Sequence, residues 1–213
     1  MSLIFRVLTP FCRVNGIGRV LDLGYQKNDM NFNNYTIKSQ EALQQAQQIA
    51  QGFGHQQIEN EHLFRAITEV DENVLPFLLK KLNVNVALVN QVVEKQLERF
   101  PKVSGTDIML SREAGKSLNE ASISAKKLGD EYVSIEHLLL GIFKSKSEIA
   151  QILKDNGVTE KGLNAAISEL RKGGNVTSQS AENTYNSLEK YARNLNALAD
   201  SGKLDPVIGR DEE

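Results

Sequence analysis

From Thr36 onward, apolar residues recur with the spacing of amphipathic helices. The first helical segment carries one apolar stripe and ends near Gly52 and Gly54. The stripe consists of Ala42, Leu43, Ala46, Ile49 and Ala50. Glu61 and Pro76 begin a second and a third segment, and a fourth runs through residues 88–97 to Phe100-Pro101. The pattern therefore predicts four helices before residue 101.

The same pattern returns about 75 residues later. Residues 58–63 (IENEHL) match residues 133–138 (VSIEHL), and Leu43 and Gly54 fall on Leu118 and Gly129. We therefore expect an all-α fold of about eight helices, built from a duplicated four-helix repeat around a pseudo-two-fold axis. Residues 36–103 form the first repeat, residues 110–172 form the second, and a loop near residues 101–107 joins them.

The two ends of the chain differ from this body. Residues 1–29 are apolar and basic, which favours a leader or upstream extension over a transit peptide or an extra element, and we leave them out of the fold. Residues 174–187 are polar and predict an exposed linker after a domain at 30–173. Residues 188–213 contain an amphipathic helix that ends at Gly202 and an extended segment, as expected for the start of another domain.

Composition narrows the class of protein. The 213 residues carry a net charge of −2, which argues against a nucleic-acid or anionic-membrane partner. No apolar run approaches the roughly 18 residues that span a bilayer. A single cysteine, Cys12, cannot form an internal disulfide, so we expect a reducing compartment and a cytoplasmic protein.

The sequence offers little support for catalysis. Residues 115–117 (GKS) end like a phosphate-binding loop, but the glycine needed five residues earlier is Leu110, so we expect a helix interior. His55, His62 and His137 lack the spacing of metal ligands, and core or capping roles are expected for them. Glu61-His62 and Glu136-His137 have no nucleophile beside them.

Binding therefore remains as the expected activity. We expect a groove between the two halves, where the helix N-termini that carry Glu61 and Glu136 meet apolar side chains. The alternative interpretation is that both glutamates only complement helix dipoles.

The duplicated unit with its Glu-His-Leu pair resembles the Clp N-terminal repeat domain, which precedes the ATPase rings of Clp-type AAA+ unfoldases. Residues 100–105 (FPKVSG), 188–195 (LEKYARNL) and 202–213 (GKLDPVIGRDEE) make residues 30–213 similar to ClpB-type disaggregases. The last motif is also shared with ClpA and ClpC relatives. By this resemblance, residues 188–213 begin the first AAA+ module.

The resemblance implies a client-binding domain that recruits unfolded or aggregated polypeptide to a hexameric, ATP-driven threading motor working with a DnaK-type chaperone. It ties Thr36, Asp130 and Glu136 to client handling, and Val207 and Ile208 to adenine contact. The fragment is expected to be monomeric, to hold no cofactor and not to hydrolyse ATP, whereas the full-length protein uses ATP and Mg.

The alternative function is an adaptor-docking and client-binding domain of a ClpA/ClpC-type unfoldase that feeds a peptidase. ClpC-type domains also imply recognition of phosphorylated arginine through Glu61 and Glu136. Here the Gly-Thr pairs of that pattern are replaced by Glu59-Asn60 and Ser134-Ile135, and Glu59 would repel a phosphate.

Overall fold

The computed structural model describes residues 32–103, 107–183 and 185. The first repeat contains η1 (Phe32–Asn34), α1 (Ile37–Phe53), β1 (Gln57–Ile58), α2 (Asn60–Val70), α3 (Val74–Lys81) and α4 (Val86–Arg99). The second contains β2 (Met109–Leu110), α5 (Arg112–Leu128), α6 (Ile135–Lys144), α7 (Glu148–Asp155), α8 (Glu160–Arg171) and η2 (Ala181–Asn183). The described residues thus contain the eight α-helices expected from the sequence, four in each repeat.

Corresponding helices in the two repeats begin and end in the same way. Thr36 caps α1 by accepting a hydrogen bond from the N–H of Ser39, and Ser111 caps α5 by accepting one from Ala114. Gly54 and Gly129 end these helices in the left-handed region, with φ of 74° and 76°. The sequence signals at these positions therefore act as expected.

The start of α3 differs slightly from the prediction. The helix begins at Val74, so Pro76 lies inside its first turn instead of opening it. Proline is tolerated there because the first N–H groups of a helix have no partner within the helix.

Equivalent elements of the two repeats make reciprocal contacts across the pseudo-two-fold axis. Tyr35 forms a parallel bridge with Val133, and β2 pairs in parallel with β1. The N–H of Thr36 donates to Val133 over 3.0 Å, and that of Ser111 donates to Ile58 over 3.1 Å. Likewise α3 packs against α8, and α4 against α7. These reciprocal contacts confirm the predicted duplication.

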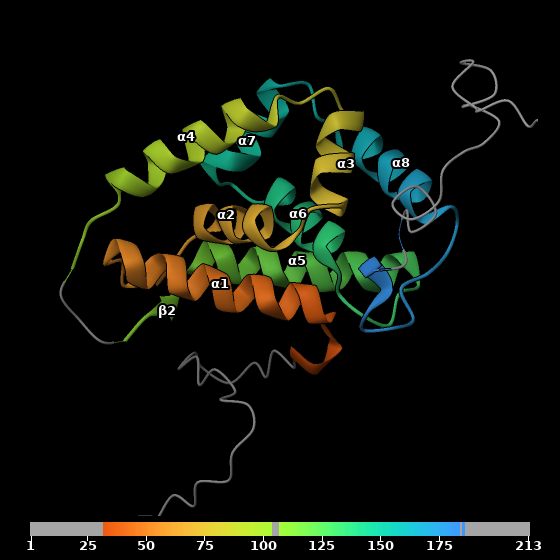
Figure 1. Cartoon of the computed structure of the whole chain (residues 1–213), viewed down its shortest axis with the longest axis horizontal. Coiled ribbons are helices and arrows are strands. Elements are labelled where there is room, and N and C mark those ends of the chain that lie inside the picture. The colour runs from red at the N-terminus through yellow and green to blue at the C-terminus, as the bar shows by residue number, and fades with distance from the viewer. Residues whose placement is uncertain (1–31, 104–106, 184, 186–213) are drawn as a thin grey trace, which may run out of the picture.

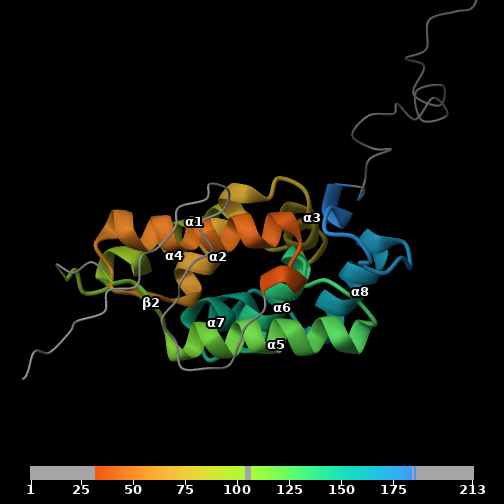
Figure 2. The same ribbon diagram turned by 90° about the horizontal axis from the view of Figure 1, so that it is seen from below.

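The two repeats share one apolar core. Figure 1 shows α2 and α6 in the middle of the domain, with α1 and α5 on one side and the α3–α8 and α4–α7 pairs on the other. Figure 2 shows that α1 and α5 run in opposite directions, so their N-termini lie at opposite ends of the domain. Within the described part of the chain, no helix is long and apolar enough to cross a membrane.

Helices α5 and α6 approach especially closely at Gly141. A Cβ atom at this position would lie 2.1 Å from the carbonyl oxygen of Ser117, a separation that no real contact allows. The equivalent residue of the first repeat, Ala66, is fully buried, so only the second repeat needs a glycine here.

The polar stretch after α8 is exposed over most of its described length but contains three buried residues. Val176, Ala181 and Glu182 are buried, although residues 177–180 between them are exposed. The N–H of Ile37 donates to Gln179 and that of Glu131 to Val176, which hold this C-terminal segment (residues 175–183) on the domain. Hydrogen bonds from distant backbone groups and the burial of Val176 and Ala181 hold this segment, and composition alone does not reveal such contacts. Residues 1–29 and 188–213 lie outside the described residues.

Candidate functional site

The N-terminus of α6 forms the centre of the first of two related clusters. Ser134 and His137 make a reciprocal capping box, in which the N–H of Ser134 donates to Nδ1 of His137 over 3.0 Å. Because Nδ1 accepts this bond, Nε2 carries the proton and donates to Oδ2 of Asp130, 3.0 Å away. The histidine is therefore a capping residue, as expected, and it links α6 to Asp130.

Arg171, the last residue of α8, neutralises two buried carboxylates in this cluster. Its Nη1 lies 2.6 Å from Oδ2 of Asp130, and its Nε lies 2.9 Å from Oε1 of Glu136. Asp130 also accepts a 2.7 Å hydrogen bond from the N–H of Val176. Burial alone would raise the pKa of Asp130, but the bonds from His137, Val176 and Arg171 lower it to about 2. Asp130 is thus held ionised.

Glu182 brings the C-terminal segment into the same cluster. Its Oε1 accepts hydrogen bonds from Oγ1 of Thr36 at 2.5 Å and from the N–H of Ile135 at 3.2 Å. Its Oε2 is buried with no hydrogen-bond partner. Burial and the nearby Glu136 raise the pKa of Glu182 to about 7 despite the bond from Thr36. The hydroxyl of Tyr185 adds a 3.2 Å bond to Glu136.

The second cluster surrounds the N-terminus of α2, at the pseudo-equivalent position. Glu59 and His62 form its capping box, and the N–H of Glu59 donates to Nδ1 of His62 over 2.9 Å. Nε2 of His62 then donates to Nδ1 of His55 over 2.8 Å. Ser111, the cap of α5, donates to Oε2 of Glu59 over 2.7 Å. Here His55 takes the place that Asp130 has in the other cluster.

Aromatic rings pack around His55 and His62. Phe100 stacks on His62 and meets His55 edge-on, and Phe53 stacks on His55. Burial lowers the pKa of both histidines, and the proximity of His55 helps to lower that of His62 to about 4. Both rings are therefore neutral at pH 7.

Glu61 lies in the first turn of α2 and is 5% exposed. Burial, with the nearby carboxylates Glu59 and Glu148, raises its pKa to about 7. Unlike Glu136, it has no arginine partner among the described residues.

The structure thus places the predicted site residues in two groups. Thr36, Asp130 and Glu136 belong to the α6 cluster, whereas Glu61 belongs to the α2 cluster at the other end of the domain. The groove lined by both Glu61 and Glu136 stays a prediction, because in this conformation each glutamate is buried in its own cluster. All four side chains are buried, so none forms an open surface in this conformation.

The sequence analysis missed three residues of the α6 cluster, Arg171, Glu182 and Tyr185. The available signal was the pair Asp130 and Glu136, since two buried carboxylates require a cation. Val207 and Ile208 lie outside the described residues. Residues 115–117 lie within α5, and no group of three or more potential metal ligands occurs in the described part of the chain.

Comparison with known proteins agrees with this architecture. Residues 34–156 match the Clp repeat (R) N-terminal domain family. The chaperone protein ClpB of Bacteroides thetaiotaomicron is 56% identical over 184 residues, and that of Porphyromonas gingivalis is 50% identical over 184 residues. Each alignment covers 86% of this chain but 21% of the relative, so the chain spans about a fifth of the length of these proteins.

Two solved structures share the fold. The Hsp104 N-terminal domain from Candida albicans matches with a TM-score of 0.62 and 22% identity, covering 70% of this chain and 98% of that one. The N-terminal domain of the ClpD chaperone from Arabidopsis thaliana matches with a TM-score of 0.54 and 18% identity, covering 69% and 100%. Because the family model matches more than half of its length, this chain belongs to the Clp repeat (R) N-terminal domain family.

Proposed function

We propose that this chain is the client-binding N-terminal domain of an ATP-dependent disaggregase, which recruits unfolded or aggregated polypeptide to a hexameric threading motor. The observation that carries the proposal is the 56% identity with a ClpB chaperone over 86% of the chain. The chain spans only about a fifth of that relative. In this proposal, the remaining four-fifths supply the motor, and this domain supplies the binding surface.

The proposed client-handling residues Thr36, Asp130 and Glu136 act through the C-terminal segment. Glu182 covers Thr36, the backbone of Val176 covers Asp130, and Arg171 with Tyr185 covers Glu136. Release of residues 175–183 would uncover Thr36 and remove the backbone bond to Asp130, while Arg171 of α8 would still pair with Asp130 and Glu136. Client polypeptide would therefore reach Thr36 first. Glu61 would act separately, at the N-terminus of α2.

The same proposal assigns the cofactors and partners to the longer protein. ATP and Mg would bind in the AAA+ module that residues 188–213 begin, with Val207 and Ile208 at the adenine, and these residues alone would not hydrolyse ATP. A DnaK-type chaperone would cooperate with the cytoplasmic hexamer, while the isolated chain would be monomeric. Nucleic acid and membranes are not among the proposed partners.

An adaptor-docking and client-binding domain of a ClpA/ClpC-type unfoldase is the second candidate. The observation that favours it is the shared fold with the N-terminal domain of ClpD, a caseinolytic protease associated chaperone. The longer protein distinguishes the two candidates, since a disaggregase returns an aggregated enzyme to activity without a peptidase.

A titration of a permanently unfolded, fluorescently labelled protein with the full 213-residue chain tests the proposal. We expect weak but saturable binding, because ordering a flexible client offsets much of the gain from burial. Glu182→Lys should release the C-terminal segment and raise the affinity several-fold. Asn183→Lys, which places the same lysine side chain at an exposed neighbour, should leave it unchanged.

Two outcomes would count against the proposal. Absence of saturable binding by the unmodified chain would remove the client-binding function itself. Equal affinities of the Glu182→Lys and Asn183→Lys variants would show that the α6 cluster does not handle clients.

A further inference from the structure

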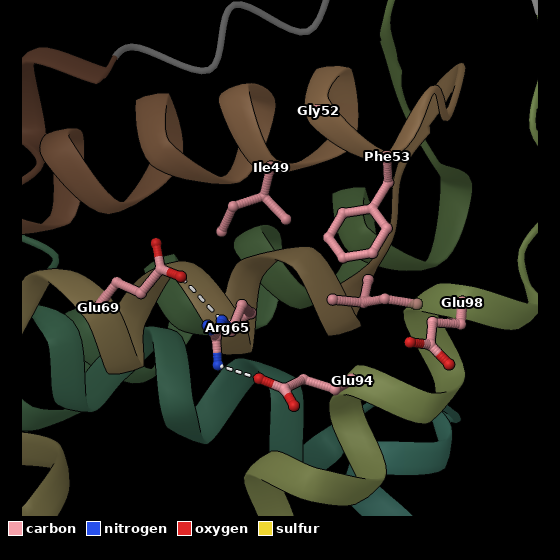
Figure 3. Close-up of a pocket in the computed structure, with 8 residues that line it drawn as sticks. Ile49, Gly52, Phe53, Arg65, Glu69, Glu94 and Glu98 are labelled. Atoms are coloured by element: carbon pink, nitrogen blue, oxygen red, sulfur yellow. Dashed lines mark hydrogen bonds and ion pairs between the residues drawn. The ribbon is translucent and has the colours of Figure 1, made fainter.

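A cavity of about 420 Å³ opens between α1, α2 and α4, away from the α6 cluster (Figure 3). Its apolar wall comes from Ile49 and Phe53 of α1 and Leu97 of α4. Ile49 and Phe53 are only partly buried, although both pack against the edge of the core. The cavity is large enough for an aromatic or branched side chain of a partner, and solvent-exposed apolar surface lines it.

Acidic side chains surround this wall. Glu69 of α2 and Glu94 and Glu98 of α4 line the cavity together with one cation, Arg65. Figure 3 shows Arg65 between Glu69 and Glu94, with its Nε 2.8 Å from Glu69 and its Nη1 2.8 Å from Glu94. Arg65 is thus already shared by two carboxylates.

Glu98 makes no ion pair with any described residue, although it lines the same cavity. The cavity therefore has a surplus of negative charge beside an apolar wall. A partner that inserts an apolar side chain and places a cation beside it would complement both features at once.

We propose that this α1–α2–α4 pocket binds an extended segment of client polypeptide in which an aromatic or branched apolar residue lies next to an arginine or lysine. The apolar side chain enters between Phe53 and Leu97, and the neighbouring cation pairs with Glu98. The inference rests on the proposed client-binding function and adds to it a second contact point, which does not require release of residues 175–183.

Gly52 offers a way to close the pocket without disturbing the core. It lines the cavity within α1, and a Cβ atom added there would meet no other atom within 4 Å. Gly52→Trp should fill the opening, and Gly52→Ala is the matched control that leaves it open. Both substitutions replace a helical glycine, so neither is expected to destabilise α1.

Short fluorescein-labelled peptides of glycine and serine around a central Phe-Arg, Ala-Arg or Phe-Glu pair provide the probes, with binding to the full chain measured by fluorescence anisotropy. Loss of the phenylalanine should weaken binding about tenfold or more, in line with the burial of one large apolar side chain. The Phe-Glu peptide should bind about three- to fivefold more weakly than Phe-Arg, as expected for an exposed ion pair.

Substitutions in the pocket should show the same dependence on the apolar side chain and on the cation. Gly52→Trp should abolish Phe-Arg binding, while Gly52→Ala retains it. Glu98→Lys should weaken Phe-Arg binding and remove the preference over Phe-Glu, whereas Glu41→Lys, an equal charge change at an exposed residue of α1 outside the pocket, should not. Equal binding of Phe-Arg by the Gly52→Trp and Gly52→Ala variants would overturn the proposal.

The outcome is distinguishable from failure of the proposed function. If the unfolded protein binds the chain but Gly52→Trp has no effect on either ligand, client binding stands and the pocket has no part in it. A concentration-dependent dimer in sedimentation equilibrium that Gly52→Trp dissociates would show that a second copy of the chain is the occupant, which would also overturn the proposal.

Discussion

The N-termini of α2 and α6 occupy equivalent places in the two repeats but have different surroundings. Both begin with a capping box that uses a histidine three residues into the helix, and both carry a buried glutamate in the first turn. The capping histidines have different partners, which are His55 in the first repeat and Asp130 in the second.

This difference decides what each cluster can bind. His55 is neutral and packs among Phe53 and Phe100, so the α2 cluster is closed by its own aromatic rings. Asp130 is charged and recruits Arg171 and the backbone of Val176, so the α6 cluster is closed by residues from farther along the chain. Because a docked segment can leave more readily than a core aromatic, the α6 cluster is the better candidate for a reversible site.

Replacing Arg171 should have the largest effect on this comparison. Arg171→Ala leaves Asp130 and Glu136 buried without their cation, and we expect a loss of about 3–5 kcal/mol in the free energy of unfolding. Urea unfolding at pH 7, followed by circular dichroism, measures it. Arg65→Ala removes an arginine from partly exposed ion pairs and should cost less than about 1 kcal/mol. Equal losses would show that burial of the α6 cluster is unimportant.

Gly141 tests whether the repeats differ in packing as well as in charge. Gly141→Ala forces α6 away from Ser117 and should cost about 1–3 kcal/mol through overpacking. Ala66→Gly, at the equivalent position in α2, should cost about 1–2 kcal/mol through lower helix propensity and the loss of a buried methyl group. Thermal unfolding of both variants gives the comparison. A harmless Gly141→Ala would mean that the close approach of α5 and α6 is not required.

The pH dependence of stability should reflect both clusters. The pKa values of Glu182 and Glu61 rise from 4.5 to about 7 on folding, so each carboxyl binds its proton more tightly in the folded state. Their contribution to stability is complete below about pH 4 and is lost as the pH rises through 7, by about 3 kcal/mol each.

Glu182→Gln and Glu61→Gln should therefore each flatten the fall in stability between pH 4.5 and 8, and the double variant should flatten it further. Urea unfolding across this pH range measures the slope. An unchanged slope in either single variant would show that the carboxyl concerned titrates normally in the folded protein.

Thr36 and Ser111 are equivalent residues of the two repeats, and replacing them should have the smallest effect. Both cap a helix, and both donate a hydrogen bond to a glutamate. Thr36→Val should cost about 1–2 kcal/mol and loosen the C-terminal segment. Hydrogen exchange of the Ile37 amide, which donates to Gln179, reports that loosening. Ser111→Ala should leave this amide protected, and faster exchange there in both variants would contradict a local effect.

Local sequence signals accounted for the helices and their duplication. The glycines at positions 54 and 129 end helices because a residue without a Cβ atom adopts the left-handed conformation without steric cost, and the caps at Thr36 and Ser111 act on residues three positions away. Such short-range effects can be recognised without knowledge of the tertiary structure.

The α6 cluster could not be found in this way. Glu182 contacts Thr36 across 146 positions and Ile135 across 47, and the burial of Val176 depends on the backbone of Glu131. A polar stretch with few apolar residues predicts exposure when only its composition is considered. The burial of a carboxylate whose hydrogen-bond donors are distant in the sequence therefore cannot be predicted from the sequence alone.

The reciprocal pairing of α3 with α8 and of α4 with α7 has a consequence for how this domain can arise and change. In a solenoid, a further copy of the unit can be added at either end because each copy contacts only its neighbours. Here each copy covers the apolar faces of the other, so the number of copies is fixed at two. A polypeptide containing only one copy would bury its apolar faces by pairing with an identical chain, in the manner of a domain-swapped homodimer.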